Sequence, residues 1–427
     1  MARLITRRNL LFVMIYFLAL LGFAIYVLVN QTPAEARLNS SGAAIELNLD
    51  DVGRLWISDY KAKEIWGVDP TSGSFVSFTV SESPVDARQA GGWLWWADGH
   101  ANFLGRIFVT DGSFTEWQIP DAPGFLGTNL DESGRLYATD SSNPYLYRLD
   151  PDHEELCTYN LPGFGASNYM VRSGDFIWLD DWYDATLIRL NTGDGSLTWW
   201  SLPAGSSPFG ISADTQGNIW YADQGLGLIA KLSPDINQLE SYLLPKGTKP
   251  QMIVYNHGYI WYTDQSLPSI GRLDPQLADH TIITPGSNVE QLTPSCTRIV
   301  PSSSGKMSIK SGILGFHNTA YPLLINSGGW EISQLPTGSD PWGIVITDFG
   351  YVVDSGRQLL IRYELPQGIS LTSTQGLETP QYLTPSPLPA SSTSTPVLLL
   401  TQEPNPAYLP VIIKSLLIPI ESTTPYP

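Results

Sequence analysis

The sequence predicts an all-β fold, a β-propeller whose blades are four-stranded sheets. Two observations lead to this prediction. A short pattern recurs at a nearly constant interval, and each copy holds four strand-like runs with no run of helix length. A period of about 40–45 residues with four strands per unit is typical of propellers. The pattern is an aromatic residue with an acid three positions later, found at Trp56/Asp59, Trp95/Asp98, Tyr137/Asp140, Trp178/Asp181, Trp220/Asp223, Trp261/Asp264 and Tyr351/Asp354.

The segment 208–245 shows the repeated unit most clearly. Four strands are expected at residues 209–213, 219–222, 228–232 and 239–243. These runs are rich in β-branched and aromatic residues and end at Gly, Pro, Asp or Ser. One such sheet cannot bury both of its faces alone. The units are therefore expected to stack in a ring in which each sheet covers its neighbours.

The number of repeats predicts eight blades. One weaker copy lies near Met307, where Lys310 takes the place of the acid. The last copy, at Tyr351, is followed after Leu365 by a segment without an outer-strand pattern. A seven-bladed ring follows instead if a terminal unit is incomplete.

Composition and charge favour a large folded domain and argue against nucleic acid as a partner. The chain has 427 residues, of which 42% are hydrophobic and 15% charged, and its net charge is −18. That length and apolar content are sufficient for a large core. Proteins that bind nucleic acid present basic surfaces, which this acidic chain lacks in its overall balance.

Local composition divides the chain into four parts. Residues 1–30 contain an uncharged run, 10–29, preceded by three arginines, which predicts a transmembrane signal-anchor with the rest exported. Residues 31–43 form a linker and residues 44–366 the propeller. Residues 367–427 form a Pro/Ser/Thr-rich low-complexity tail, whose apolar end is too interrupted to span a membrane.

This organisation predicts a single-pass protein of the cell membrane with its propeller on the extracytoplasmic side. A second outcome is open, because Ala34-Glu35-Ala36 resembles a signal-peptidase site. Cleavage there would secrete the protein.

The two cysteines, Cys157 and Cys296, are expected to be free. Cys157 falls on the predicted outer strand of the third unit, and Cys296 on the predicted inner strand of the seventh. A disulfide requires Cα atoms within roughly 7 Å of each other. The two positions are expected in different blades and at different distances from the ring axis.

The repeated motif P-x-G-I-x-x-D-x-x-G-x-I-W-[FY]-x-[DE], with I-x-[RK]-L-x-P and Y-x-L-P after it, resembles the streptogramin B lyase (virginiamycin B lyase) family of propellers. The resemblance is strongest at residues 208–245 and 250–275 and weakest at 285–340. It implies an enzyme that opens a cyclic depsipeptide antibiotic by elimination at its ester link with a divalent metal. The family ring has seven blades, so eight units here would be a departure.

The histidines that the resemblance would require are missing. In the family they follow the proline that opens an inner strand, in the motif P-H-[AG]-I. The corresponding positions here are Val85, Leu126, Asn168, Phe209, Gln251, Ser295 and Trp342. No catalytic base is therefore carried over, elimination has no evident proton acceptor, and the catalytic residues are unknown.

The acids of the repeat form the most regular polar feature, and each ends a second strand. Two interpretations are open. Each Asp accepts hydrogen bonds from backbone N–H groups of its own turn, or several of them form a site for a polar ligand or for a cation such as Mg²⁺ or Ca²⁺. The five histidines show no metal-ligand spacing, so no metal site is assigned.

The acids are expected to share one face of the ring with several non-repeated aromatic residues. In antiparallel blades that run outward, second strands end where first strands begin, at one mouth of the central channel. A few polar groups among apolar walls are typical of a small-molecule site. The candidate ligand-binding residues are Asp181, Trp182, Tyr183, Phe209, Asp223, Gln251, Asp264 and Trp342.

Two functions of different classes are consistent with these features. The first is a non-catalytic binding or interaction module at the cell surface, which takes a small molecule, glycan or peptide at the channel mouth and needs no cofactor. The second is a divalent-metal-dependent lyase for a cyclic depsipeptide or related ester, with a base such as His100. The distance between His100 and the ring of acids distinguishes them.

Overall fold

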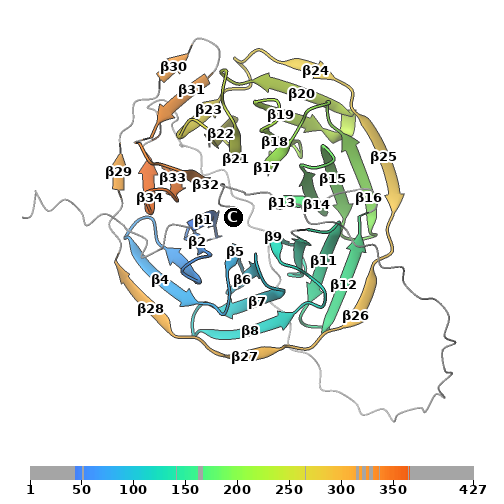
Figure 1. Cartoon of the computed structure of the whole chain (residues 1–427), viewed down its shortest axis with the longest axis vertical. Coiled ribbons are helices and arrows are strands. Elements are labelled where there is room, and N and C mark those ends of the chain that lie inside the picture. The colour runs from blue at the N-terminus through green and yellow to red at the C-terminus, as the bar shows by residue number, and fades with distance from the viewer. Residues whose placement is uncertain are drawn as a thin grey trace, which may run out of the picture.

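The computed structural model is an all-β propeller of seven blades around a central axis (Figure 1). It describes residues 44–50, 52–140, 142–161, 167–264, 266–313, 317–319, 324–326, 330–335, 337–363 and 365. The prediction of eight blades is therefore wrong, and the alternative of seven is confirmed. All seven pairs of neighbouring inner strands lie against each other, so the ring is closed.

Within a blade, successive antiparallel strands run from the channel to the rim. Blade 1 contains β1 (Ala44–Leu49), β2 (Leu55–Asp59), β3 (Glu64–Val68) and β4 (Ser74–Thr79), and blade 2 contains β5 (Pro84–Ala90), β6 (Trp93–Asp98), β7 (Phe103–Phe108) and β8 (Ser113–Gln118). Blade 3 contains β9 (Phe125–Leu130), β10 (Leu136–Asp140), β11 (Tyr145–Asp150) and β12 (Glu155–Asn160), and blade 4 contains β13 (Ser167–Ser173), β14 (Phe176–Asp181), β15 (Thr186–Asn191) and β16 (Ser196–Ser201).

Blades 5 to 7 follow the same plan, with differences in their outer strands. Blade 5 contains β17 (Pro208–Ala213), β18 (Ile219–Asp223), β19 (Leu228–Ser233) and β20 (Gln238–Leu243). Blade 6 contains β21 (Pro250–Asn256), β22 (Tyr259–Asp264), β23 (Ser269–Leu273) and β31 (Trp330–Gln334), and blade 7 contains β32 (Pro341–Ile346), β33 (Gly350–Asp354) and β34 (Leu359–Tyr363).

The repeated aromatic residue joins each blade to the next. In each blade it lies on the second strand and belongs to the apolar cluster shared with the following blade, as Trp178 does between blades 4 and 5 and Tyr351 does between blades 7 and 1. The described residues form seven such clusters, one at each junction. Because each sheet buries both faces in this way, the ring itself is the hydrophobic core.

The third strand supplies a cation opposite this aromatic residue in six of the seven blades. Arg106 pairs with Trp95 across the strands, and its guanidinium carbon lies 5.2 Å from the indole centroid. Arg189 lies 5.5 Å from Trp178 in the same way. Such contacts contribute about 0.5–2 kcal/mol each. The I-x-[RK]-L part of the repeat is therefore the partner of its aromatic part.

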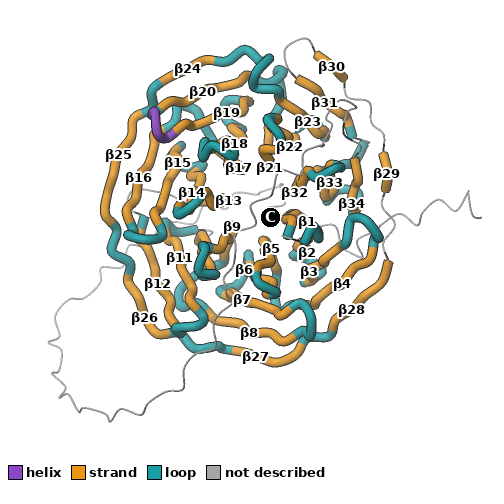
Figure 2. Tube along the Cα trace, turned by 180° about the vertical axis from the view of Figure 1, so that it is seen from behind, coloured by secondary structure: helices purple, strands orange, loops and turns teal. Residues whose placement is uncertain are grey.

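The segment near Met307 does not form the predicted eighth blade, but lies as a belt around the outside of the ring. After β23 the chain returns around the outside of the ring and adds one strand to each blade in reverse order (Figures 1 and 2). We call residues 281–326 the belt. Its strands are β24 (Thr281–Ile283) on blade 5, β25 (Gly286–Gln291) on blade 4, β26 (Ser295–Arg298) on blade 3, β27 (Ser303–Lys306) on blade 2, β28 (Ile309–Ile313) on blade 1, β29 (His317–Thr319) on blade 7 and β30 (Leu324–Asn326) on blade 6.

The belt also overturns the prediction of free cysteines. Cys296 is not on an inner strand but on belt strand β26, directly opposite Cys157 of β12. The two form a disulfide, with their Cα atoms 4.0 Å apart. The prediction failed because the belt brings residues 139 positions apart to the same radius on blade 3.

In the described part of the chain, no helix is long and apolar enough to cross a membrane. The predicted signal-anchor (1–30), linker (31–43) and low-complexity tail (367–427) lie outside the described residues.

Candidate functional site at the mouth of the channel

Each inner strand begins with the same irregularity at one mouth of the channel. The first residue of the strand pairs with the repeated acid, as Pro208 does with Asp223 and Pro250 with Asp264, and a register shift follows at once. The same shift occurs in all seven blades. Bulges of this kind redirect a side chain out of the regular ladder. We call the residue after the first one of each inner strand the bulge residue.

The seven bulge residues include six of the seven predicted positions. They are Ile45, Val85, Leu126, Asn168, Phe209, Gln251 and Trp342. The seventh predicted position, Ser295, is wrong because it lies on belt strand β26. Ile45 takes its place. No bulge residue is a histidine.

Apolar side chains close the mouth from several blades. Val85 of blade 2, Phe125 of blade 3 and Trp342 of blade 7 belong to one buried cluster, with Tyr60 and Phe209 packed against it. Blades 2, 5 and 7 are not neighbours, so these contacts pass across the axis. We call these five residues the mouth cluster. Trp342 is only 5% exposed, and its indole N–H donates to Asp340 Oδ2 at 3.0 Å.

Gln251 is the polar exception among the bulge residues. It lies between Phe209 of blade 5 and Trp342 of blade 7, at the same position of the repeat, and is 1% exposed. Among the described residues, neither Nε2 nor Oε1 of its amide has a hydrogen-bond partner. A buried polar group left unpaired costs about 1–3 kcal/mol, so an orphaned amide of this kind needs an explanation.

The ring acids cap their own turns, so the first of the two interpretations is confirmed. In every blade, Oδ1 of the acid accepts a hydrogen bond from the backbone N–H three residues later, at 2.7–3.1 Å; the acids are Asp59, Asp98, Asp140, Asp181, Asp223, Asp264 and Asp354. All seven side chains are at most 1% exposed. Asp223 and Asp264 also accept from Ser207 N and Lys249 N, which fixes the chain just before the bulge.

The aromatic residues predicted for this face differ in their exposure. Tyr183 is 66% exposed, and its ring centroid lies 4.4 Å from that of Trp182. Phe209 is half-buried and packs edge to face on Tyr169 at 5.3 Å. Of the eight predicted ligand-binding residues, Tyr183, Trp182 and Phe209 therefore present surface, whereas the three acids, Gln251 and Trp342 are buried.

The comparisons with known proteins agree with this architecture. The family model described as the virginiamycin B lyase family matches residues 34–299. The chain belongs to this family. The predicted resemblance is thereby confirmed. A comparison with the curated proteins gave no significant match.

Solved structures share the fold of the family member described here at low identity. A streptogramin B lyase structure matches with a TM-score of 0.58 and 19% identity, over 76% of this chain and 94% of that one. Virginiamycin B lyase from Staphylococcus aureus matches with a TM-score of 0.57 and 17% identity, over 75% of this chain and 95% of that one. The catalytically inactive histidine-to-alanine variant of that enzyme with quinupristin matches with a TM-score of 0.56 and 17% identity, over 76% of this chain and 96% of that one.

His100 lies at the rim of this mouth and apart from any cluster of metal ligands. Its backbone N–H donates to Asp98 Oδ1 at 2.8 Å, and its ring stacks on Tyr60 with centroids 6.0 Å apart. Among the described residues, the one group of three potential metal ligands is Glu155, Cys157 and Cys296, far out on the rim. Two of its three ligand atoms are joined in the disulfide, so the group does not offer a metal site in this form.

Tyr60 and Phe125 are the members of the mouth cluster that the sequence analysis missed. Tyr60 follows Asp59 directly, as Trp182 follows Asp181. The position after each ring acid was the available signal, because it opens the loop on the mouth face.

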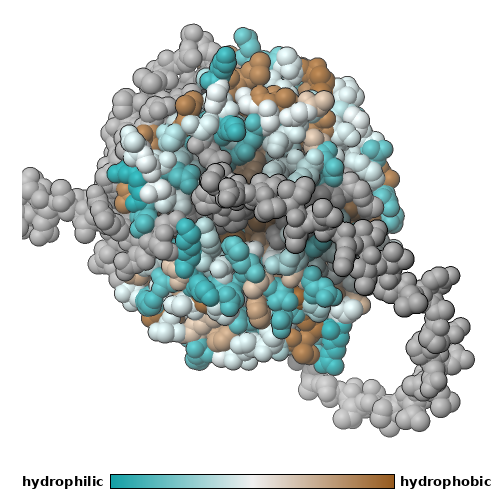
Figure 3. Space-filling view, viewed as in Figure 1, coloured by the Kyte–Doolittle hydropathy of each residue, from teal (hydrophilic) through white to brown (hydrophobic). Residues whose placement is uncertain are grey.

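Elsewhere on the surface, hydrophobic residues gather over β20 and β24 (Figure 3), where Leu243, Ile282 and Ile283 are 43–67% exposed.

Burial gives one ring acid a measurable signature. The pKa of Asp98 is raised, chiefly because burial penalises the charged form, although the N–H groups of His100 and Ala101 oppose the shift. A raised folded pKa means that this group contributes stability at low pH, which is lost as pH rises through the folded value. The exposed Asp111 has its pKa lowered to about 2 by hydrogen bonds from Ser113 and Lys306, so its contribution has the opposite pH dependence.

We predict that Asp98→Asn is tolerated near neutral pH, because the amide oxygen keeps the turn cap, whereas Asp98→Ala lowers the free energy of unfolding by about 1–3 kcal/mol. Urea unfolding between pH 3 and 8 measures both. As pH rises, the free energy of unfolding of the wild type should fall relative to that of Asp98→Asn. Asp111→Asn is the matched control, and relative to it the free energy of unfolding of the wild type should increase with pH. If both differences changed with pH in the same way, burial would not be the cause of the raised pKa of Asp98.

Proposed function

We propose that this chain is a non-catalytic ligand-binding module of the virginiamycin B lyase family, exported and held at the cell surface by an N-terminal anchor. The ligand is a small molecule, glycan or peptide taken at the mouth of the channel. Binding at this site needs no cofactor.

The observation that carries the proposal is the absence of histidine from all seven bulge positions, now assigned by register. The catalytically inactive relative with quinupristin is a histidine-to-alanine variant. Elimination requires a base within reach of the proton that it removes. Val85, Phe209 and Trp342 supply none, and they fill the mouth with apolar atoms instead.

Gln251 supports recognition at the same place. Its amide combines donors and an acceptor, none of which has a partner among the residues that the structure describes, and its repeat position lies between those of two aromatic bulge residues. A ligand that carries an amide, hydroxyl or carboxyl group would satisfy it once Phe209 and the loop aromatics Trp182 and Tyr183 admit the ligand. A few oriented polar groups among aromatic walls are typical of specific small-molecule sites.

Anchoring rests on the uncharged run 10–29 behind three arginines. We predict that the full chain, made in a bacterial host, sediments with membranes and resists carbonate extraction, and that protease added outside the cytoplasm degrades the propeller. A variant that lacks residues 1–30 should be soluble. Recovery of a chain that lacks residues 1–36 in the soluble exported fraction would show cleavage after Ala36, and recovery of the full-length chain in the cytoplasm would refute export.

We predict that the purified protein does not open quinupristin in the presence of Mg²⁺, because no bulge residue can accept the proton. Chromatography with mass detection follows the ring-opened product, and the Staphylococcus aureus enzyme serves as the positive control. Product formed at an enzymatic rate would contradict the proposal. Loss of that product in a His100→Ala variant would then establish the lyase alternative.

We predict that Gln251→Leu weakens binding of ligands found in a thermal-shift screen of glycans, peptides and quinupristin by about tenfold or more, since it removes a buried hydrogen-bonding group. The matched control is Gln216→Leu, in the exposed turn on the opposite face, which should leave the affinity unchanged. Titration calorimetry measures both variants. Binding that survives Gln251→Leu but fails with Gln216→Leu would place the site on the other face.

A further inference from the structure

The belt crosses the point where the two ends of the propeller meet. Blade 1 and blade 7 form separate sheets, so no described strand of one is hydrogen-bonded to the other. Among the described residues, apolar side chains join them, in the cluster that holds Leu47 and Val345. The belt passes from β28 on blade 1 directly to β29 on blade 7 (Figure 1). It therefore holds the outside of this junction.

Few apolar contacts hold the belt between blades 4 and 2. Every side chain of β25, β26 and β27 is exposed, and the buried anchors of this stretch are Leu292 and Ile299. The belt also carries three cations that pair with acids on the rim of an otherwise acidic chain; they are Arg298 with Glu154, Lys306 with Asp111 and Lys310 with Glu64. Exposed ion pairs contribute about 0–1 kcal/mol each.

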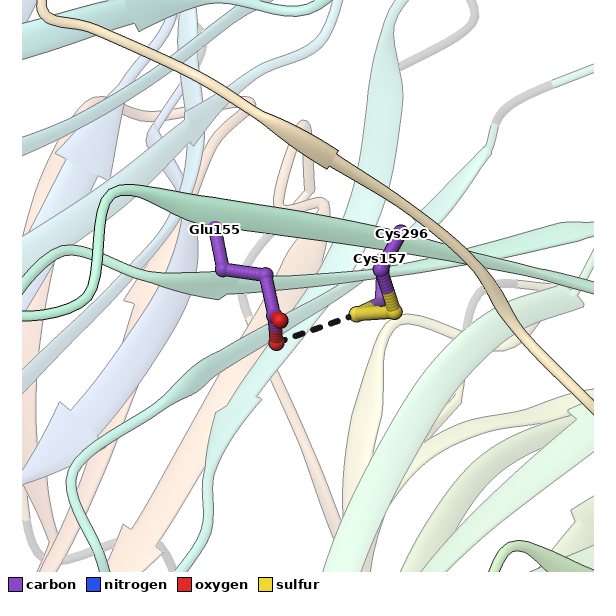
Figure 4. Close-up of side chains that lie close together, drawn as sticks. All are labelled: Glu155, Cys157 and Cys296. Carbon is purple, nitrogen blue, oxygen red and sulfur yellow. Dashed lines mark hydrogen bonds between the residues drawn. A yellow bond between two sulfur atoms is a disulfide. The ribbon is translucent and has the colours of Figure 1, made fainter. Parts of the chain in front are cut away.

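The covalent attachment is the disulfide to blade 3, and its two sulfurs differ in surroundings (Figure 4). Cys157 is fully buried, whereas Cys296 is exposed. Arg148 Nη2 lies 2.9 Å from Cys157 Sγ and 2.6 Å from Glu155 Oε1. That carboxylate oxygen lies 3.2 Å from the same sulfur. The buried sulfur therefore faces a guanidinium and a carboxylate that are themselves paired.

We infer that the Cys157–Cys296 disulfide is a redox latch that controls the outer closure of the ring. A thiolate of a dithiol reductant attacks Sγ of Cys296, the residue of the pair that is exposed, the S–S bond breaks, and Cys157 leaves with the electron pair as a thiolate beside Arg148. The second thiol of the reductant then displaces Cys296. In total, the protein disulfide gains two electrons and two protons, and the dithiol becomes a disulfide.

The environment sets the rate of this step. A thiol of lower pKa is the better leaving group in disulfide exchange. The guanidinium of Arg148 favours a thiolate at Cys157, and the carboxylate of Glu155 opposes it. The two side chains should therefore affect the rate of reduction in opposite directions, which a purely structural disulfide with an inaccessible sulfur would not show.

Release of the latch removes the fixed point from which the belt reaches the junction of blades 1 and 7. Between the disulfide and blade 6, the belt is held by short ladders on β27, β28 and β29, by the packing of Met307 and Ile309 against the cluster of blades 1 and 2, and by the ion pairs. Its far end stays fixed, because β31 is the regular fourth strand of blade 6. Reduction should therefore loosen the belt on blades 3, 2, 1 and 7 and leave the inner strands of blades 3 and 4 as they were.

The first experiment compares hydrogen exchange of the full-length protein, in detergent, before and after reduction with dithiothreitol. Amides of β26, β27 and β28 should exchange on the order of tenfold faster after reduction, and those of β9 and β13 should not change. Cys296→Ser, a change at an exposed position, should reproduce the reduced pattern without reductant. Identical exchange of the belt in the oxidised, reduced and Cys296→Ser proteins would overturn the latch.

The second experiment measures the rate of reduction by dithiothreitol, with thiol alkylation and mass spectrometry as the readout. Glu155→Gln should speed reduction and Arg148→Gln should slow it, each by about threefold or more, while Arg148→Lys keeps the cation and most of the wild-type rate. If Arg148→Gln does not fold, the rate of reduction of Glu155→Gln tests the proposal by itself, because Glu155 is partly exposed and its replacement is less disruptive. An unchanged or lower rate in Glu155→Gln would refute Cys157 as the leaving group.

Discussion

The packing of each flat sheet against the next is the constraint on which the whole structure depends. A four-stranded sheet with apolar side chains on both faces is stable only between two others. The repeated aromatic residue serves this purpose, because Trp56, Trp178 and Tyr351 each enter the cluster shared with the following blade. The cation opposite it on the third strand covers the ring from the other side. The aromatic residue, repeated in all seven blades and paired with a cation in six, explains both the motif and the packing of neighbouring blades.

Closure by side-chain packing alone leaves the junction between the first and last blades without a shared strand. The belt meets this need from outside. It adds hydrogen bonds along the rim edges, which would otherwise be open strands available for association with other chains. It also carries cations to the acidic rim of blades 1 to 3. The belt is thus a second, circumferential layer of structure around a radially packed ring.

The mouth of the channel shows how a family scaffold can change its chemistry. The turn caps and bulges that place a side chain at the axis are kept in every blade, and the side chains placed there are not histidines. Val85 and Trp342 belong to one apolar cluster, with Phe209 packed against it, and Gln251 occupies the same position of the repeat in blade 6. The bulge that places a side chain near the axis is therefore common to all seven blades, and none of the residues placed there is a histidine.

The sequence by itself determined the repeated blade unit, the family and the positions of the ring acids, because these are recorded in a motif that lies within one blade. An Asp that caps a turn three residues later, or an aromatic residue opposite a cation on the next strand, is written into a short motif. Only the tertiary structure decided the number of blades, the belt, the Cys157–Cys296 bond and the burial of Gln251 and Trp342. The belt strands are short, and every residue of β24, β25, β26 and β27 is exposed, so these strands show no alternation of buried and exposed residues. Their partners lie up to 246 positions away, and no local pattern records which blade they join.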